Sequence, residues 1–267
     1  MASEFTSESL QVKLAPIIPG EIRYFDVTGS TNDDALRWLQ AGAPDGSLVV
    51  ADEQTSGRGR MQRTWVTRPG ASLAFSLIFR PQIHDQIPFY APLGALGVAL
   101  TLEKLYGVCP EIKWPNDVLI FRKKVCGILA EADWQDSQLA GLVLGIGINV
   151  ASTAVRKEDN FIFPADSLQN SLGRPIDRLD VLVETIRSVF LWRQKIGNDV
   201  FLREWNNRLA FRGEKVQIHR PQQDVMNGTV LHIAPDGALW IRTDNGEDVP
   251  VSAGDVSLRQ TQTSPTK

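Results

Sequence analysis

The sequence predicts an α+β protein, in which a mixed β-sheet flanked by helices is followed by a small C-terminal β-barrel. Apolar, strand-like runs recur between residues 22 and 150. A long apolar helix is predicted at 88–106, and from residue 211 onward the runs become short and alternating, as in a small antiparallel barrel. The predicted units are a loosely ordered segment (1–20), a larger domain (21–210), a barrel (211–260) and a tail (261–267).

Composition narrows the class of protein without naming a function. The chain has 267 residues, of which 43% are hydrophobic and 22% charged, as in ordinary soluble globular proteins. A net charge of −3 argues against general binding of nucleic acid, which needs a basic surface. Cys109 and Cys126 have no metal-binding spacing to a histidine, so neither a disulfide framework nor a zinc site is expected. Without an apolar run of membrane-spanning length or a signal peptide, we expect a cytoplasmic protein.

The first half of the larger domain reads as a strand, a helix and two further strands. Residues 22–26 predict the strand, and the helix begins after Ser30, a good N-cap followed by acidic residues, and ends before Gly42. Two apolar runs, 47–51 and 72–79, predict buried strands on either side of an arginine-rich loop.

A long helix and four strands follow. Small residues recur through the predicted helix, which implies close packing against a sheet, and Gly107 ends it. The four strands are predicted at 111–114, 118–121, 125–129 and 142–150. The last of them is too apolar for an exposed face and should be central, and a basic turn at 122–124 joins the second to the third.

The rest of the chain predicts a loop, two helices and the barrel. Residues 152–173 have no clean period, and we expect 152–161 to be mobile until a ligand orders them. An apolar face over 179–190 predicts one helix, and another follows at about 199–209. Turn signals, such as the Asp-Asn-Gly sequence at 244–246, then separate five short strands.

The loop between the strands at 47–51 and 72–79 carries the strongest chemical signal. Its nine residues contain Gly57, Arg58, Gly59, Arg60, Arg63 and Trp65. Because three guanidinium groups repel one another, a short loop that holds them is best explained by an anionic ligand. The glycines let the backbone approach that ligand, and the indole offers a face on which a base could stack. An exposed, solvated basic turn is the alternative, but a loop between two buried strands is held rigidly, which favours the anion site.

A second polar cluster surrounds a proline-fixed turn. Its members are Lys113, Pro115, Asn116 and Asp117. One tight hairpin later, Lys124 can return beside Asp117 across paired strands. Alone, this cluster fits a structural turn with solvent-facing lysines equally well. Together with the arginine-rich loop, it favours a phosphate site.

Two glycines, Gly145 and Gly147, leave one apolar strand without side chains at two positions. A ligand could lie flat there, or the strand could simply pack tightly against the glycine-bearing helix. The strand lacks the third glycine of a dinucleotide fingerprint, and the sequence has no phosphate-binding P-loop, nucleophile elbow or zinc-protease motif. A nucleotide would therefore be bound by another design.

In their order along the chain, these motifs resemble those of biotin protein ligases. The matching residues are Ser30, Thr31, Asn32, Gln54, Gly57, Arg58, Gly59, Arg60, Arg63, Trp65, the run 113–117, Lys124, the run 127–129, Gly145, Gly147 and Asn149. The resemblance covers about 22–260 and implies a class II synthetase-like biotin/lipoate ligase catalytic domain with a small SH3-like β-barrel. The N-terminal winged-helix DNA-binding domain of bifunctional members has no room here. We therefore expect a monofunctional ligase without DNA binding.

The resemblance implies a two-step, ATP-dependent reaction. The carboxylate of biotin attacks the α-phosphorus of Mg-ATP to give biotinyl-5′-AMP, and a lysine of a biotin carboxyl carrier protein then attacks this mixed anhydride and releases AMP. An anionic nucleophile that approaches a triphosphate needs positive charge, which Arg60, Arg63 and Lys124 can supply. The expected ligands are thus biotin, ATP and Mg²⁺, and the expected partner is the carrier protein. No membrane partner is expected, and a homodimer through sheet edges stays open.

The same resemblance assigns residues to each part of the site. Biotin is expected at Ser30, Thr31, Asn32, Gln54, Gly57, Arg58, Gly59, Arg60, Lys124 and Gly127. ATP is expected at Arg60, Arg63, Trp65, Lys113, Asn116, Ile146 and Asn149. The expected catalytic residues are Arg60, Lys124 and Asp117. Asp117 would either orient or deprotonate the acceptor lysine or bind Mg²⁺, whose ligands the sequence does not assign.

Two other functions stay open at this point. A ligase for lipoate or octanoate would need a long apolar tunnel and would not need the pattern at 57–65. A non-catalytic regulator that binds biotin could keep the same fold. The presence of Arg60, Lys124 and Asp117 speaks against such a regulator.

Overall fold

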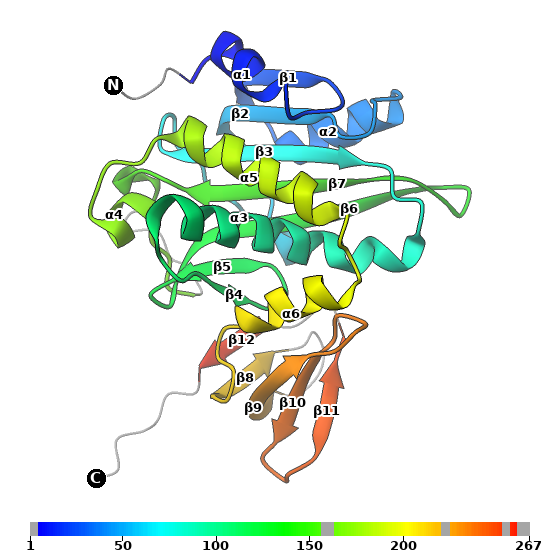
Figure 1. The fold of residues 1–267 in the computed structure, drawn as a ribbon, viewed down its shortest axis with the longest axis vertical. Coiled ribbons are helices and arrows are strands. Elements are labelled where there is room, and N and C mark those ends of the chain that lie inside the picture. The colour runs from blue at the N-terminus through cyan, green and yellow to red at the C-terminus, as the bar shows by residue number, and fades with distance from the viewer. Residues whose placement is uncertain (1–4, 156–162, 220–224, 253–256, 261–267) are drawn as a thin grey trace.

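The computed structural model describes residues 5–155, 163–219, 225–252 and 257–260. It confirms the α+β class, because seven strands form a mixed sheet in the order β1-β2-β3-β7-β6-β5-β4 with helices packed on it (Figure 1). The strands are β1 (Ile22–Thr28), β2 (Leu48–Gln54), β3 (Ser72–Phe79), β4 (Glu111–Lys113), β5 (Asp117–Ile120), β6 (Lys123–Gln135) and β7 (Gln138–Asn149). β1 and β2 pair in parallel, whereas the other neighbours in this sheet run antiparallel.

Six α-helices are described, with short 3₁₀ turns at Arg60–Gln62, His84–Phe89 and Ser152–Ala154. The helices are α1 (Ser7–Leu14), α2 (Thr31–Gln40), α3 (Tyr90–Tyr106), α4 (Leu168–Leu172), α5 (Arg178–Arg193) and α6 (Asp199–Asn207). None of the helices in the described ranges is long and apolar enough to cross a membrane.

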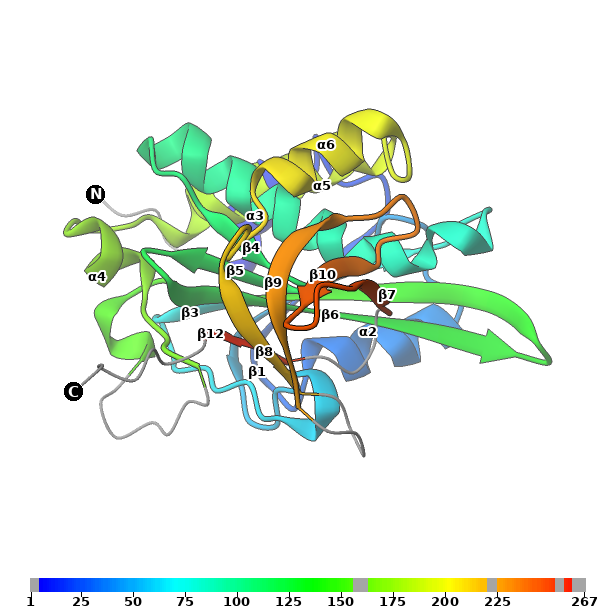
Figure 2. The same ribbon diagram turned by 90° about the horizontal axis from the view of Figure 1, so that it is seen from below.

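The two faces of the large sheet bury different cores, because successive residues of a strand point to opposite faces. α3 and α5 lie on one face, and α2 lies on the other (Figure 2). On β7, Leu144 belongs to the main core beneath α3 and α5, whereas its neighbour Val143 packs with Trp38 of α2. Gly145 and Gly147 lie on the same face of β7 as Val143, so these two glycines face α2 and the loops rather than α3. Together with Gly127 on β6, they are called the glycine strip below.

The long apolar helix begins at Tyr90, two residues later than predicted, because Pro88 lies in the preceding 3₁₀ turn. Gly107 ends it as predicted, in the left-handed conformation with φ of 68°. Its small residues do permit close packing. A methyl group added at Gly97 would lie 2.7 Å from a methyl carbon of Val189 on α5.

The hairpin of β6 and β7 is longer than predicted, since pairing continues from Cys126 opposite Ile148 out to Gln135 opposite Gln138. The basic turn before it is also tighter than predicted. Phe121 and Arg122 alone make the turn, both with positive φ, and β6 begins at Lys123. The early start of β6 brings Lys124 into the sheet.

Residues 5–20 are not loosely ordered as predicted, because they contain α1. The Thr6 hydroxyl accepts from the backbone of Ser9, and the Ser9 side chain reciprocates, which makes a capping box. Leu10 and Leu14, one turn apart, are completely buried against the main core. Two leucines in eight residues are too short a pattern to identify a helix from sequence.

The C-terminal unit is a five-stranded antiparallel sheet in the order β11-β10-β9-β8-β12. Its strands are β8 (Lys215–His219), β9 (Met226–Ile233), β10 (Leu239–Thr243), β11 (Asp248–Val251) and β12 (Ser257–Gln260). The predicted strands are therefore present, but no backbone pairing in the described residues closes them into a barrel. Closure would require β11 to pair with β12, and β12 instead pairs with β8 at the opposite edge.

This unit is attached directly to the β4–β5 hairpin. The indole Nε1 of Trp114, a completely buried side chain, donates to the carbonyl of Gly237 at 3.0 Å. The backbone of Ile112 accepts from Ala210 at 2.9 Å and donates to Arg208 at 2.6 Å. The C-terminal unit thus supports the hairpin that carries the second polar cluster.

Leu10→Ala should destabilise the protein by about 2–5 kcal/mol, because it leaves a cavity where a buried leucine contacted the core. Val12→Ala is the matched control, since Val12 lies on the same helix and is 69% exposed. Urea unfolding of both variants checks the difference. Equal stabilities of the two variants would show that α1 is not docked.

Candidate active site

A cavity of about 450 Å³ opens on the α2 side of the sheet. Sixteen of the seventeen predicted site residues line it: Ser30, Thr31, Asn32, Gln54, Arg58, Gly59, Arg60, Arg63, Trp65, Lys113, Asn116, Asp117, Lys124, Gly127, Ile146 and Asn149. Gly57 is not among the lining residues. A methyl group there would lie 2.5 Å from the carbonyl oxygen of Trp65 and 2.7 Å from Nε2 of Gln54, so Gly57 permits the loop to fold and does not touch the cavity.

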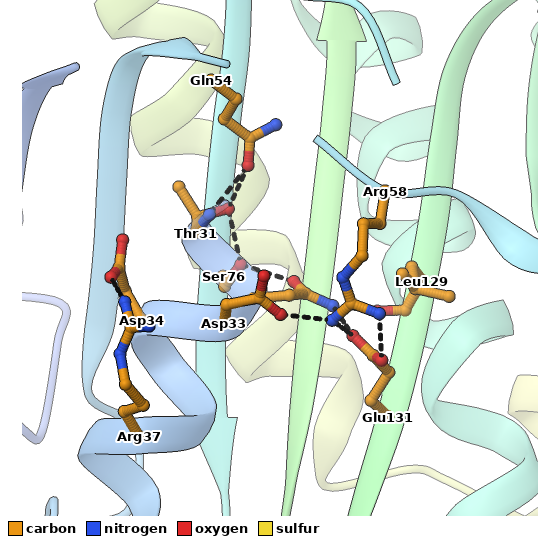
Figure 3. A network of polar contacts seen from close by, with 10 residues as sticks. Thr31, Asp33, Asp34, Arg37, Gln54, Arg58, Ser76, Leu129 and Glu131 are labelled. Carbon is orange, nitrogen blue, oxygen red and sulfur yellow. Dashed lines mark hydrogen bonds and ion pairs between the residues drawn. The ribbon is translucent and has the colours of Figure 1, made fainter. Parts of the chain in front are cut away.

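One end of the cavity is polar and uncharged. Gln54 Oε1 accepts from the backbone N–H of Thr31 at 2.8 Å, and the Thr31 hydroxyl lies 2.9 Å from the same oxygen (Figure 3). Ser76 Oγ lies 2.8 Å from Thr31 Oγ1 and donates to Asn32 Oδ1 at 2.6 Å. Ser30 holds the N-cap position of α2 but makes no capping bond with its side chain, which lines this end of the cavity. All five side chains are buried, so their unused polar atoms favour a neutral ligand with its own donors and acceptors.

The glycine strip serves side chains of the protein itself. A methyl group at Gly145 would collide with Asn32 Oδ1, and one at Gly147 would collide with the indole of Trp65. A methyl group at Gly127, on the neighbouring strand, would lie 3.1 Å from the same indole and 3.0 Å from Lys124 Nζ. All three glycines also line the cavity, as the interpretation of the strand as a ligand floor requires. Packing against α3, the other interpretation, is wrong, because the nearest atoms belong to Asn32, Trp65 and Lys124.

The other end of the cavity concentrates positive charge around one carboxylate. Lys124 Nζ lies 2.6 Å from Asp117 Oδ1, and Lys113 Nζ lies 3.2 Å from Asp117 Oδ2. The return of Lys124 to Asp117, predicted from the hairpin, is therefore confirmed. Arg60 Nη1 donates to Asn116 Oδ1 at 3.4 Å, and the Asn116 amide donates to the carbonyl of Ile128 at 2.6 Å.

The charges at this end shift the pKa values of their neighbours. Burial alone would raise the pKa of Asp117, but Lys124 and Lys113 overcome it and lower the pKa to about 2. Burial also lowers the pKa of Lys113, more than Asp117 raises it. Asp117 is therefore ionised throughout the physiological range and is a weak base.

The segment after the predicted lid lies beside the cationic end. Lys124 N donates to the carbonyl of Pro164, and Asp166 N donates to that of Lys124. The Asn149 amide donates to the carbonyl of Asp166 at 3.2 Å, and Lys113 Nζ lies 4.9 Å from the ring centroid of Phe163. Most of the segment predicted to become ordered with a ligand (152–161) lies outside the described residues, which omit 156–162.

The sequence predicts that the three arginines of the loop share one anionic ligand. For Arg58 this prediction is wrong, because its side chain pairs with two carboxylates of the protein. Its Nη1 and Nη2 contact the two carboxylate oxygens of Glu131 at 2.8 and 2.9 Å, and Nη2 also contacts Asp33 at 2.6 Å (Figure 3). The charge of Arg58 is thus balanced inside the protein, and a shared anion site for all three arginines is not what the structure shows. The sequence reasoning missed Glu131. One signal for Glu131 is present in the sequence. Glu131 lies four residues after Gly127, and alternate residues of a strand share a face, so both belong to the same face of β6.

The described residues contain no group of three or more metal-ligating side chains. Asp117 is a poor Mg²⁺ ligand in this arrangement, because two ammonium groups already contact its two oxygens. Mg²⁺ is usually held by nucleotide phosphates with one or two carboxylates, so the residues present fit a cation that arrives with the nucleotide.

Known proteins resemble this chain in both sequence and fold. Residues 24–149 match the biotin/lipoate A/B protein ligase family, and 212–259 match the biotin protein ligase C-terminal domain. The bifunctional ligase/repressor BirA of Bacillus spizizenii is 41% identical over 84% of this chain and 70% of its own length. The biotin–[acetyl-CoA-carboxylase] ligase of Paracoccus denitrificans is 33% identical over 83% and 94%, respectively. A solved structure of Aquifex aeolicus biotin protein ligase in complex with biotin and ATP is 27% identical, with a TM-score of 0.75 over 90% of this chain and 99% of that one.

The fold, the cavity and these matches define the class of protein: a ligase of the biotin/lipoate A/B protein ligase family. Within that family, the chain belongs to the biotin protein ligases, whose C-terminal domain it also carries.

Asp117→Asn should destabilise the protein in a pH-dependent manner. The pKa of about 2 in the folded state lies below the unfolded value near 4, so the carboxylate stabilises the fold above pH 4 and loses this contribution as the pH falls to 2. Since one pKa unit corresponds to 1.36 kcal/mol, the contribution is about 2 kcal/mol. Urea unfolding from pH 2 to 7 should show the gap between wild type and variant shrinking in acid. A gap of constant size would contradict the assignment.

Proposed function

We propose that this protein is an ATP-dependent biotin–protein ligase. It activates biotin as biotinyl-5′-AMP and transfers it to a lysine of a biotin carboxyl carrier protein. The observation that supports this best is the polarity of the cavity described above, which has a neutral hydrogen-bonding end and a cationic end. A small polar ring system with a carboxylate tail, joined to a triphosphate, matches that order of groups.

The neutral end suits the ureido ring of biotin. A ureido group has one carbonyl acceptor and two N–H donors, and the hydroxyls and amides of Ser30, Thr31 and Gln54 provide both kinds of partner. Buried polar groups left without partners cost free energy, so this lining disfavours ligands with apolar head groups. Lipoate and octanoate have no ureido group, which makes the lipoate ligase alternative the weaker one.

The cationic end suits the first reaction step. The biotin carboxylate forms a bond to the α-phosphorus of ATP while the bond from that phosphorus to the bridging oxygen breaks and pyrophosphate leaves. Both reactants are anions, so the step requires positive charge at their junction. Lys124, held by Asp117 at 2.6 Å, and Arg60 are placed to supply it.

Trp65 suits the adenine base. Its indole rests over Gly127 and Gly147, with Lys124 Nζ 5.6 Å from the ring centroid, and it lines the cavity. In the described part of the chain, its Nε1 has no hydrogen-bond acceptor although it is buried. A stacked base contributes about 1–3 kcal/mol of binding free energy in other nucleotide complexes.

In the second step, the amine of the acceptor lysine attacks the carbonyl carbon of the mixed anhydride, AMP leaves, and the amine loses a proton. Asp117 fits an orienting role better than that of the base, because its pKa of about 2 makes it a weak proton acceptor. It holds Lys113 and Lys124 at the site of phosphate charge.

Biotin-dependent exchange of pyrophosphate into ATP tests the proposal. Wild type should support exchange with biotin and not with lipoate or octanoate. Lys124→Ala should abolish it, because the charge at the junction is lost, whereas Lys104→Ala on α3, an exposed lysine paired with Glu184, should leave it intact. Exchange with lipoate would favour the lipoate ligase, and its absence with all three acids would favour the non-catalytic regulator.

Arg60→Gly should weaken retention of biotinyl-5′-AMP more than it slows its formation. If Arg60 grips the phosphate of the intermediate, its loss weakens retention by roughly 1.5–3 kcal/mol, or about one to two powers of ten. The freed adenylate would then acylate exposed lysines of a bystander such as albumin. Biotin blots of albumin should be positive with the variant and negative with wild type. A variant inactive toward every acceptor would assign Arg60 to chemistry or folding instead.

A further inference from the structure

The arginine loop (residues 57–65) is a self-bonded unit. Gly59 N donates to the Arg63 carbonyl at 2.7 Å, and Trp65 N donates to that of Gly57 at 2.8 Å. At its base, the Thr67 hydroxyl lies 2.6 Å from the backbone N–H of Gln54 and 3.1 Å from its carbonyl oxygen. The loop therefore keeps its own shape, and its position over the cavity depends on contacts to other elements.

Arg58 makes three of these contacts. Its side chain reaches from the loop to Glu131 on β6 and Asp33 on α2 (Figure 3). Two parallel N–H···O bonds to one carboxylate are the most specific geometry that an arginine can adopt. A guanidinium engaged in this way is not available to a ligand.

The carboxylate that receives Arg58 is itself fixed by the cavity lining. Asn32 Nδ2 donates to Glu131 Oε2 at 2.7 Å and lies 3.3 Å from the carbonyl of Leu129. The same Asn32 accepts from Ser76, which contacts Thr31. A continuous chain of hydrogen bonds thus links the proposed ureido pocket to the ion pair that holds the loop.

We propose that Arg58, Glu131 and Asp33 form a latch that keeps the arginine loop closed over the cavity. The latch rests on the proposed function only in the identity of the ligand retained, which is biotin and its adenylate. Arg58 is then a positioning residue. It sets how long a ligand stays, whereas Arg60 and Lys124 act on the reacting groups.

A latch and a ligand-binding role for the Arg58 guanidinium predict different effects of Glu131→Gln on ligand binding. If Glu131 merely competed with an anionic ligand for Arg58, then Glu131→Gln would release Arg58 and tighten binding. If Glu131 anchors the latch, the same change would loosen the loop and weaken retention. The two ideas predict opposite signs for one substitution.

Trypsin provides a test that needs no ligand, because the loop carries cleavage sites at Arg60 and Arg63 in addition to Arg58. Glu131→Gln should speed cleavage after Arg60 and Arg63 of the ligand-free protein by about three- to tenfold, the range expected for a partly exposed charged pair. Cleavage after Arg58 is not counted, because the substitution uncovers that side chain directly. Arg37→Gln is the matched control. It breaks an ion pair with Asp34 on the same helix, α2, that does not involve the loop. Equal cleavage rates in wild type and Glu131→Gln would overturn the latch, whatever the function of the protein.

A double-mutant cycle in biotin dissociation completes the test. Arg58→Gln and Glu131→Gln should each speed dissociation by about three- to tenfold. The double variant should be no faster than Arg58→Gln alone, since loss of the Arg58 guanidinium already removes its contacts to both Glu131 and Asp33. Melting temperatures of all variants should stay close to that of wild type. Multiplicative effects, or slower dissociation from Glu131→Gln, would overturn the latch. A wild-type protein that binds no biotin would overturn the proposed function, while the trypsin result would still stand for or against the latch.

Discussion

The site depends on a strip of three glycines on the central hairpin of β6 and β7. Without side chains at Gly127, Gly145 and Gly147, the sheet surface is low enough for Asn32 and Trp65 to lie directly on it. Asn32 then reaches Glu131, and through it the arginine loop, while the indole closes the cavity floor beside Lys124. A single added methyl group at Gly145 or Gly147 would displace one of these side chains and with it one end of the cavity.

The two ends of the cavity differ in charge because their cations are paired differently. Arg58 is fully paired with carboxylates, whereas the end around Asp117 keeps a net positive charge. Arg58 is matched by two carboxylates, and its contribution is mechanical. Around Asp117, one carboxylate faces both Lys113 and Lys124, so this end remains cationic even though each lysine is held in position. Because Asp117 is buried, loss of its lysine partners would cost free energy of folding, since a buried charge without partners is unfavourable. The net positive end is where the proposed reaction brings two anions together.

The local parts of this arrangement could be predicted from sequence, and the distant ones could not. The return of Lys124 to Asp117 follows from a hairpin of a few residues, and Gly107 marks a helix end by itself. The pairing of Arg58 with Glu131 joins residues 73 positions apart, and the sequence offers no register to connect them. For the same reason, the sequence does not reveal that Asn32 of α2 and Trp65 of the loop lie over the glycines of β7. Helix α1 was missed because its evidence is two buried leucines.

A ligase that makes a reactive intermediate must hold it and later expose it to a protein acceptor. A latch built in the core would hold well but would open slowly, since breaking a buried ion pair costs several kcal/mol. The Arg58 side chain is 39% exposed, and exposed pairs typically contribute about 0.2–1 kcal/mol. Contacts of that strength favour the closed loop while allowing it to open often. At the cationic end, Lys113 and Asp117 are buried. Under the proposed function, this end would grip the intermediate, while the loop and its latch would set how often the cavity opens to release it. The three glycines connect the two ends, because they seat Asn32 and Trp65.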